Sequence, residues 1–310
     1  MEGAIASARC QRVELAASSS TSAGPATHRL LDWRAIMWYK PAMTEEVHAD
    51  EGTAADSGGM KSLIRGLQTL EVISEHQPIG VGELARMLKL PKSTVQRTLV
   101  SLAQAGWLEP AGSERTRWEL THHVWTIGQR AGKSTLLRDV AMPLMRELGT
   151  TTAEAIHLAV PGGTQGVVTL DRVDSTQPVR VYNPLGATFP FHSCASGKAI
   201  LAFWPQQRVD EVLSRPLAKM TDRTTVDPEA LRLELDEVRE RGYALNTAEN
   251  RPGVCAIGCP IRGRDGYAVA SISISMPQDR YDWRHVPKWG EQLIAAANKI
   301  ESAWIESNAN

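Results

Sequence analysis

The sequence contains neither a long apolar run nor an excess of charge of one sign. No stretch approaches the roughly 20 consecutive apolar residues that a membrane-spanning helix needs. Arg9, Arg12 and Glu14 interrupt any apolar core that a signal peptide would require. The formal net charge is −1, so the chain as a whole is not strongly basic. We therefore expect a cytoplasmic protein without a membrane segment.

Motifs of nucleophilic enzymes are also missing, since the sequence has neither a GxSxG nor an SxxK pattern. His192, Cys194 and Lys198 lie close together, but side chains so near in sequence seldom reach hydrogen-bonding geometry across a strand-to-helix turn. The spacing of Cys255 and Cys259 is not that of a standard zinc site. We expect no catalytic residue, metal ligand or cofactor. A thiol enzyme, or a redox or metal sensor using Cys194, is the alternative.

Length and composition favour two folded domains. The chain has 310 residues, of which 42% are hydrophobic, which is long for one compact core and sufficient for two. Residues 1–59 differ from the rest, because Ala, Ser, Thr and Gly dominate positions 4–26 and positions 45–59 are acidic. We predict a weakly ordered extension over 1–59. Methionines within and just after it leave open a later start of the native chain.

Residues 91–106 have the pattern of a helix with one apolar and one polar face. Apolar residues recur at i, i+4, i+7 and i+8, at Val95, Leu99, Leu102 and Ala103. The opposite face offers hydroxyl, amide and basic groups, which bond to base edges and phosphates. No acidic residue lies between positions 84 and 108. An ordinary amphipathic surface helix is the alternative. The residues predicted to contact DNA are Lys92, Ser93, Thr94, Gln96 and Arg97.

The flanking sequence favours the DNA-binding interpretation. Residues 61–74 carry an apolar helical stripe that includes Leu63, Ile64 and Leu67, which suits a scaffold helix. A second short helical pattern over 81–88 ends in a turn before the polar-faced helix, which is the helix-turn-helix arrangement. Two short strands at 107–109 and 115–120 then predict a wing. On that wing, Arg115 and Arg117 are expected to reach backbone phosphates.

The charge of this segment supports DNA binding only weakly. Residues 60–121 contain eight Lys and Arg against six Asp and Glu. We therefore expect binding to depend on a dimer that doubles the number of contacts.

Two stretches of this segment, SLIRGLQTLEVI and VGELARMLKLPKSTVQRTLVSLAQAGWLE, resemble the N-terminal domain of the IclR family of bacterial transcriptional regulators. The resemblance extends over about residues 60–305. It continues through IHLAV, LDRVDSTQPVRVY, FPFHSCASGKAILAF and RGYALNTAENRPGVCAIGCPI, in the order and spacing of the family. The wing departs from it, because Trp-Glu-Leu-Thr at 118–121 stands where the family usually has Tyr-Arg-Leu-Gly. The resemblance implies a ligand-responsive regulator that binds a palindromic double-stranded DNA operator.

The second half of the chain predicts an antiparallel sheet. Strands are expected at 155–160, 166–173, 255–262 and 267–276, with tight turn signals between the members of each pair. Helices are expected at 137–149, 195–204 and 228–241, against one face of the sheet. The resemblance implies the same fold, a curved antiparallel sheet similar to GAF and PAS sensor domains. The predicted fold class is therefore α+β.

A ligand site is expected where the helix at 195–204 begins. Small residues and free backbone N–H groups crowd its first turn, and such a helix start favours anions. A plain N-cap by Ser193 is the alternative. Strand alternation places Ser271, Ser273 and Ser275 together on one sheet face. Facing a cavity, these hydroxyls would hold a carboxylate or hydroxyl group.

The resemblance implies which residues bind the effector, which is a small acidic metabolite in the family. The corresponding residues in this sequence are Ala195, Ser196, Asn246, Ala256, Ser273 and Ser275. Asn246 stands where an Asp is common, and Ala256 stands where a Cys can occur. Loss of the acid should ease the binding of a more anionic ligand or change the hydrogen-bond pattern.

The predicted organisation is an extension over 1–59, a winged helix-turn-helix domain over 60–121, a linker helix over 122–136 and an effector-binding domain over 137–305. Val124 and Ile127 give the linker helix an apolar stripe. The resemblance implies that this helix takes part in a homodimer, with a dimer of dimers as a larger possible assembly. Packing of the stripe against its own domain is the alternative.

Overall fold

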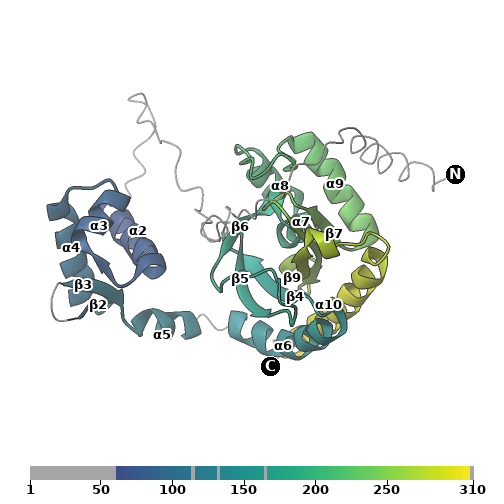
Figure 1. Ribbon diagram of the computed structural model, residues 1–310, viewed down its shortest axis with the longest axis horizontal. Helices are drawn as coiled ribbons and strands as arrows, with labels where there is room; N and C mark the ends of the chain where they lie inside the picture. The colour runs from purple at the N-terminus through teal and green to yellow at the C-terminus, as the bar shows by residue number, and fades with distance from the viewer. Residues whose placement is uncertain (1–60, 113–115, 131–132, 164–165, 308–310) are drawn as a thin grey trace, which may run out of the picture. The chain divides into compact units, whose positions relative to one another are not determined.

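The computed structural model describes residues 61–112, 116–130, 133–163 and 166–307. It contains an N-terminal part with helices and a small sheet and a C-terminal part built on a larger curved sheet (Figure 1). The predicted α+β class is confirmed. No helix within the described ranges is long and apolar enough to cross a membrane.

The N-terminal part is a winged helix-turn-helix, as predicted. Three antiparallel strands in the order β1-β3-β2 form its sheet, and Ile79 of β1 lies opposite Trp118 of β3. The turn between the second and third helices places Lys89 in the left-handed region with φ of 53°. The elements are α2 (Lys61–His76), β1 (Ile79–Gly80), α3 (Val81–Met87), α4 (Lys92–Gln104), β2 (Leu108–Ala111) and β3 (Arg117–Leu120).

The apolar face predicted for residues 91–106 forms the core of this part. Val95 and Leu99 of α4 are fully buried beside Leu84 of α3, Ile73 of α2 and Trp118 of β3. Leu102 and Ala103 pack against the same cluster. Burial of this face fixes the rotation of α4, so its polar face points outward.

The apolar stripe predicted for the first helix is only partly buried. Leu63, Ile64 and Leu67 are between 50% and 61% exposed in the single chain, whereas Gly66 and Thr69 are buried. The scaffold role therefore belongs to the second half of α2. Three neighbouring large apolar side chains remain uncovered by the described residues of this chain.

Two helices occupy the region predicted as the linker. Helix α5 spans His123–Arg130, and α6 (Lys133–Thr152) begins before the expected start at 137. Val124, Trp125 and Ile127 of α5 are exposed. The predicted stripe is therefore not buried by the described residues of its own chain.

The C-terminal part contains a six-stranded sheet in the order β6-β5-β4-β9-β8-β7, with all neighbouring strands antiparallel. The predicted curved antiparallel sheet is confirmed. Two hairpins, β4-β5 and β8-β9, pair through the central strands β4 and β9 (Figure 1). The strands are β4 (Ala155–Pro161), β5 (Gly166–Val173), β6 (Thr188–Pro190), β7 (Ala244–Thr247), β8 (Val254–Arg262) and β9 (Ala268–Pro277).

Helices cover both faces of this sheet, so the prediction of helices against one face is wrong. Two helices pack on one face, α6 and α10 (Val286–Ser307). Three others, α7 (Ala195–Ala202), α8 (Gln206–Leu213) and α9 (Pro228–Arg241), belong to the core on the other face. The sequence analysis missed α8 and α10. Without α10, helix α6 alone would be too small to cover the apolar residues of one sheet face.

Two glycines let α7 lie directly on the sheet. A Cβ atom at Gly258 of β8 would come within 2.7 Å of the backbone of Ala195, and one at Gly197 would come within 2.3 Å of the Phe191 carbonyl oxygen. A side chain at Gly258 would push α7 away from the sheet, and one at Gly197 would displace the turn at Phe191 that leads into the helix. The first turn of α7 therefore lies against the centre of the sheet, where the candidate ligand site is built.

Candidate functional site

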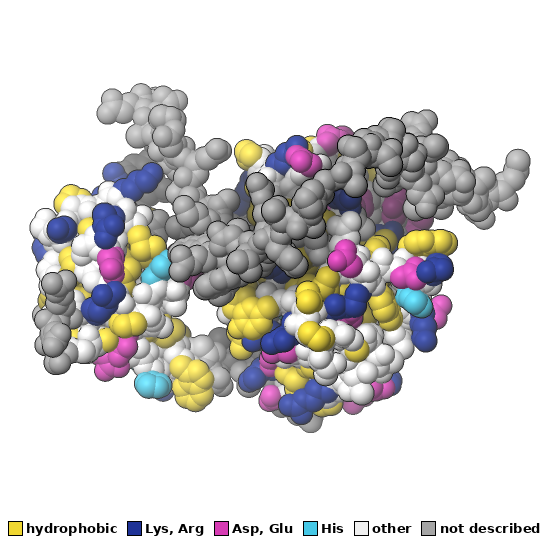
Figure 2. Space-filling model, viewed as in Figure 1, with side chains coloured by type: hydrophobic (Ala, Val, Ile, Leu, Met, Phe, Trp, Pro, Cys, Tyr) yellow, Lys and Arg dark blue, Asp and Glu magenta, His cyan; other side chains and the backbone are white. Residues whose placement is uncertain are grey.

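The polar face of α4 is exposed as the sequence analysis predicted. Lys92, Ser93, Gln96 and Arg97 are exposed, and Thr94 is partly buried. Lys and Arg side chains are spread over the visible face of the N-terminal part, with few acidic side chains among them (Figure 2). These groups are accessible to DNA. Their contacts with bases or phosphates stay a prediction.

The wing differs from the simple prediction of two phosphate contacts. Arg117 is exposed but forms an ion pair with Glu83 Oε2 at 2.9 Å, and its Nε donates to the Pro78 carbonyl oxygen. These bonds tie β3 to α3. A phosphate contact by Arg117 would have to replace or share them. Arg115 lies outside the described residues.

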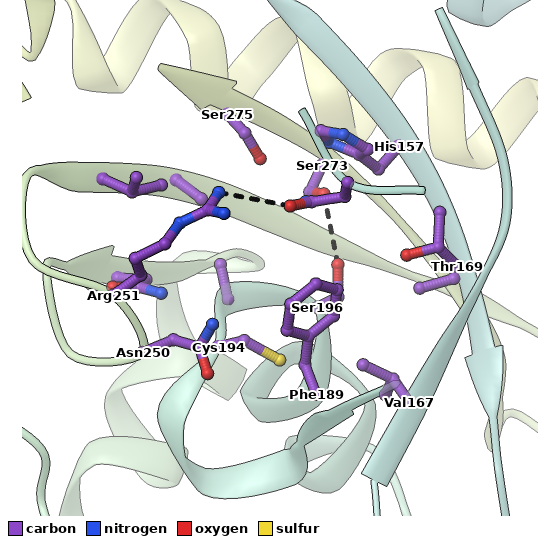
Figure 3. Close-up of a pocket in the computed structure, with 16 residues that line it drawn as sticks. His157, Val167, Thr169, Phe189, Cys194, Ser196, Asn250, Arg251, Ser273 and Ser275 are labelled. Atoms are coloured by element: carbon purple, nitrogen blue, oxygen red, sulfur yellow. Dashed lines mark hydrogen bonds between the residues drawn. The ribbon is translucent and has the colours of Figure 1, made fainter. Parts of the chain in front are cut away.

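A small cavity lies between the sheet and α7 in the C-terminal part (Figure 3). Its volume is about 50 Å³, which is more than the roughly 10 to 15 Å³ that one water requires. The cavity therefore has room for a small ligand. All six predicted effector residues line it, namely Ala195, Ser196, Asn246, Ala256, Ser273 and Ser275.

Strand alternation brings these residues to one face of the sheet. On β9, Ile272, Ile274 and Met276 enter the core under α6 and α10, while Ser273 and Ser275 line the cavity. Ser271 is buried on the same side but does not line the cavity. The predicted separation of hydroxyls from apolar chains is thus confirmed.

The first turn of α7 supplies the opposite wall. Its N-cap is Cys194, whose sulfur accepts from Gly197 N at 3.3 Å, so the alternative of an N-cap by Ser193 is wrong. Ser193 instead donates to Asn250 Oδ1 at 3.1 Å. Ser196 donates to Ser273 Oγ at 3.1 Å, which joins the helix start to β9 across the cavity.

Asn246 is largely committed to holding the site together. Its side-chain amide donates to the Ser193 carbonyl oxygen at 3.1 Å and accepts from Glu249 N at 2.9 Å. An Asp at this position would keep the acceptor but lose the donor. The Asn therefore orders the loop that follows β7 and leaves the cavity wall uncharged.

A buried ion-pair network lies behind this wall. Lys198 Nζ contacts Glu234 Oε1 at 2.5 Å and Glu249 Oε2 at 2.6 Å, and Lys198 is fully buried. Burial raises the pKa of the Glu249 carboxyl above its ordinary value. The lysine thus points away from the cavity and joins α7, α9 and the loop after β7.

The cysteine chemistry considered from the sequence has no supporting geometry. Burial raises the pKa of the Cys194 thiol to about 12, so the group is protonated at neutral pH and is a poor nucleophile. Cys255 and Cys259 belong to the core on the opposite sheet face. His192 Nε2 bonds to the Ala218 carbonyl oxygen at 2.8 Å. These four side chains do not form one cluster.

Several cavity residues were missed by sequence reasoning. His157 of β4 and Thr169 of β5 are buried in the wall, and Asn183 and Arg251 enter from loops. Burial, and secondarily Arg172, lower the pKa of the His157 imidazole to about 4, so it is neutral at pH 7. Neither residue type nor spacing singled out these positions, since a lone His in an apolar strand usually belongs to a core.

Comparisons with known proteins agree with this architecture. The IclR helix-turn-helix domain model matches residues 62–112, and the model of the bacterial transcriptional regulator IclR C-terminal domain matches residues 129–302. The regulator KdgR of Escherichia coli is 32% identical over 256 residues, covering 82% of this chain and 96% of KdgR. The repressor IclR of the same organism is 31% identical, covering 81% of this chain and 93% of the repressor.

A solved structure of similar fold contains a ligand. The IclR homolog from Microbacterium hydrocarbonoxydans, complexed with 4-hydroxybenzoate, has a TM-score of 0.68 and 27% identity. The match covers 79% of this chain and 99% of that protein. A helix-turn-helix domain followed by an effector domain defines a DNA-binding transcriptional regulator. The chain belongs to the IclR family of bacterial transcriptional regulators.

Proposed function

We propose that this regulator binds a palindromic operator as a homodimer and that a small carboxylate in the C-terminal cavity changes its affinity for DNA. The observation that carries the effector class is the charge of the cavity wall. Among the described residues, its lining contains one cation, Arg251, and no carboxylate, while His157 is neutral. A ligand with a negative charge therefore suits this wall best.

The DNA contacts are assigned to the exposed face of α4. Lys92, Ser93, Thr94, Gln96 and Arg97 follow one another on that face, and hydroxyl, amide and guanidinium groups are the common partners of base edges and phosphates. Arg115 and Arg117 would add phosphate contacts from the wing. The recognition helix has no acidic residue that would repel DNA.

The homodimer is supported by apolar side chains left uncovered on two helices. Leu63, Ile64 and Leu67 of α2 and Val124, Trp125 and Ile127 of α5 are all at least 38% exposed. Groups of large exposed apolar side chains mark interaction surfaces. A palindromic operator requires two symmetry-related recognition helices. A second, weaker contact between dimers would give a dimer of dimers.

The working division of the chain remains the one predicted from sequence. We assign DNA binding to residues 60–121, the connection to 122–136 and effector binding to 137–305. The effector acts only if it binds the DNA-competent and DNA-incompetent arrangements unequally. Its binding residues in this proposal are Ala195, Ser196, Asn246, Ala256, Ser273 and Ser275.

The test uses the full chain and DNA from upstream of its own gene. Gel shifts at several salt concentrations should show binding that weakens steeply with salt, because phosphate contacts release counterions. Gln96→Ala and Arg97→Ala should each weaken specific binding by about 1 to 3 kcal/mol where the side chain reads a base. An unchanged gel shift with both residues replaced would refute this assignment of the recognition helix.

The effector half is tested by Ser196→Leu, which fills the cavity. The variant should bind DNA like the wild type but show no response to small carboxylates. Thr225→Leu, a substitution away from the cavity lining, is the control and should keep the response. Loss of DNA binding together with ligand response would indicate misfolding, which a thermal melt would reveal.

A further inference from the structure

We infer that Arg251 binds the carboxylate of the effector and that His157 bonds a second, uncharged polar group on the same molecule. The ligand class is then a compact monocarboxylate that carries a hydroxyl or carbonyl group. This inference rests on the proposed effector role of the cavity. It adds two recognition residues and narrows the chemistry of the ligand.

Arg251 differs from every comparable arginine within the described ranges. Six arginines are partly buried, and five of them lie within 4.0 Å of a carboxylate. Those five are Arg172, Arg232, Arg241, Arg262 and Arg280. Arg251 has no such partner among the described residues, and its one recorded side-chain bond, to Asn183 Oδ1, is 3.3 Å long. Within the described residues, no carboxylate therefore neutralises the charge of Arg251.

The surroundings of Arg251 make this uncompensated charge a recognition feature. Burial lowers the pKa of its guanidinium from the ordinary value, which reports the cost of removing the charge from water. A carboxylate ligand would offset that cost and could accept two parallel hydrogen bonds from the planar guanidinium. Arg251 reaches into the cavity from the side opposite Thr169 and Val167 (Figure 3).

His157 is the second polar group without a partner. It is only 3% exposed, and both ring nitrogens lack a hydrogen bond in the described structure. A neutral imidazole offers one donor and one acceptor, and leaving such buried groups unsatisfied costs free energy. His157 lies opposite Ser273 in the β4-β9 register, on the cavity face of the sheet. A ligand hydroxyl or carbonyl would satisfy it.

The two residues together define the ligand more narrowly than either alone. Arg251 comes from the loop after β7 and His157 from the central strand β4, so they approach the cavity from different walls (Figure 3). A ligand hydroxyl or carbonyl would bond to the buried His157 ring without bringing a second charge into the site, whereas a second carboxylate would have to be buried without a cation beside it. The lining therefore favours a hydroxy or oxo monocarboxylate over a dicarboxylate or an unsubstituted acid.

The experiment is calorimetric titration of the full-length protein with two matched sets of probes. One set is 4-hydroxybenzoate, benzoate, terephthalate and 4-hydroxybenzamide, and the other is lactate, propionate, malonate and lactamide. Within each set, the members add or remove the hydroxyl, a second carboxylate or the negative charge. Each set is measured on the wild type, Arg251→Gln, Arg251→Lys, His157→Leu and the control Arg264→Gln, which alters an exposed arginine away from the cavity.

In at least one set, the hydroxy acid should bind the wild type about tenfold or more tightly than its three analogues. Arg251→Gln should weaken the binding of the hydroxy acid about 10- to 100-fold, which corresponds to the loss of a charged hydrogen bond. It should weaken the binding of the amide less than threefold. Arg251→Lys should recover part of the loss. His157→Leu should remove the preference for the hydroxy acid over the unsubstituted acid. The control should match the wild type.

If Arg251→Gln weakens the binding of the acid and of the amide equally, the inference is overturned. It is also overturned if a diacid or an unsubstituted acid binds the wild type as tightly as the hydroxy acid. If a carboxylate still changes the affinity of the protein for DNA in those cases, the proposed function stands although the inference about Arg251 and His157 fails. Failure of all eight probes to bind also counts against the inference. The salt-dependent gel shift then decides separately whether the DNA-binding proposal stands. Melting temperatures and gel shifts of each variant verify folding.

Discussion

The two faces of the six-stranded sheet come from the same strands but are built for different tasks. Under α6 and α10, the strands present Ile156, Leu158, Ile257, Ile272 and Ile274, all fully buried in one apolar cluster. Under α7, the intervening positions are polar or small and line a cavity. One face stabilises the domain by burial of apolar surface, while the other leaves space and polar groups for a ligand.

This difference shows how polar groups can line a cavity without weakening the apolar core on the other face of the same sheet. Because side chains alternate along a strand, Ser273 and Ile274 are neighbours in sequence yet belong to opposite faces. The apolar face fixes the register, and the polar face is then free to carry recognition. Substitutions on the two faces should therefore affect different properties.

The largest expected effect concerns the ion pairs that hold α7 over the cavity. Lys198→Met should lower the free energy of unfolding by about 3 to 5 kcal/mol, because it leaves Glu249 buried without its cation. Glu234→Gln, at the more exposed partner, should cost less. Chemical denaturation of both variants measures the difference. Equal, small effects would show that packing alone holds this helix.

The pH dependence of the same variant sharpens the test. Burial already raises the pKa of Glu249, and removal of Lys198 should raise it further. A carboxyl with a raised folded-state pKa favours the folded state below its unfolded pKa and loses that contribution as pH rises through the folded value. The destabilisation by Lys198→Met should therefore be smaller at pH 5 than at pH 8. The opposite trend would contradict the assignment.

A neighbouring pair of substitutions tests the two faces directly. Ile274→Ala should cost about 2 to 5 kcal/mol of stability, because it creates a cavity in the apolar cluster. Ser273→Ala should change the free energy of unfolding by about 1 kcal/mol or less. It should weaken ligand binding, because it removes a hydroxyl from the cavity wall. Thermal melts and ligand titrations separate the two. Similar stability losses would refute the proposed division between faces.

A smaller effect is expected from restoring an acid to the cavity. Asn246→Asp should weaken the binding of an anionic ligand by at least about 1 kcal/mol, because two like charges about 4 Å apart repel by that much in water and by more in a buried site. It should also remove the bond to the Ser193 carbonyl oxygen. Titration with 4-hydroxybenzoate and 4-hydroxybenzamide provides the comparison. The neutral amide should be affected less than the acid.

Much of the fold and part of the site were predictable from the sequence. The recognition helix has a strong 3.6-residue pattern, and the serines of β9 alternate with apolar residues, so both were recognised from local order. Arg251 and His157 were not, because their significance depends on the absence of a partner in three dimensions. Helix α10 was missed, and the apolar stripe predicted to make α2 a scaffold helix is exposed in its first half. Local periodicity shows that a face is apolar but not what covers it.

We propose that occupation of the cavity changes DNA binding by α4. The most direct test is fluorescence anisotropy of a labelled upstream DNA fragment with the full chain, with and without 4-hydroxybenzoate or lactate. We expect at least one ligand to change the affinity of the wild type for the fragment about fivefold or more. Ser196→Leu should bind the fragment equally well and not respond. An unchanged affinity in the wild type despite measured ligand binding, or the same response in Ser196→Leu, would contradict the claim.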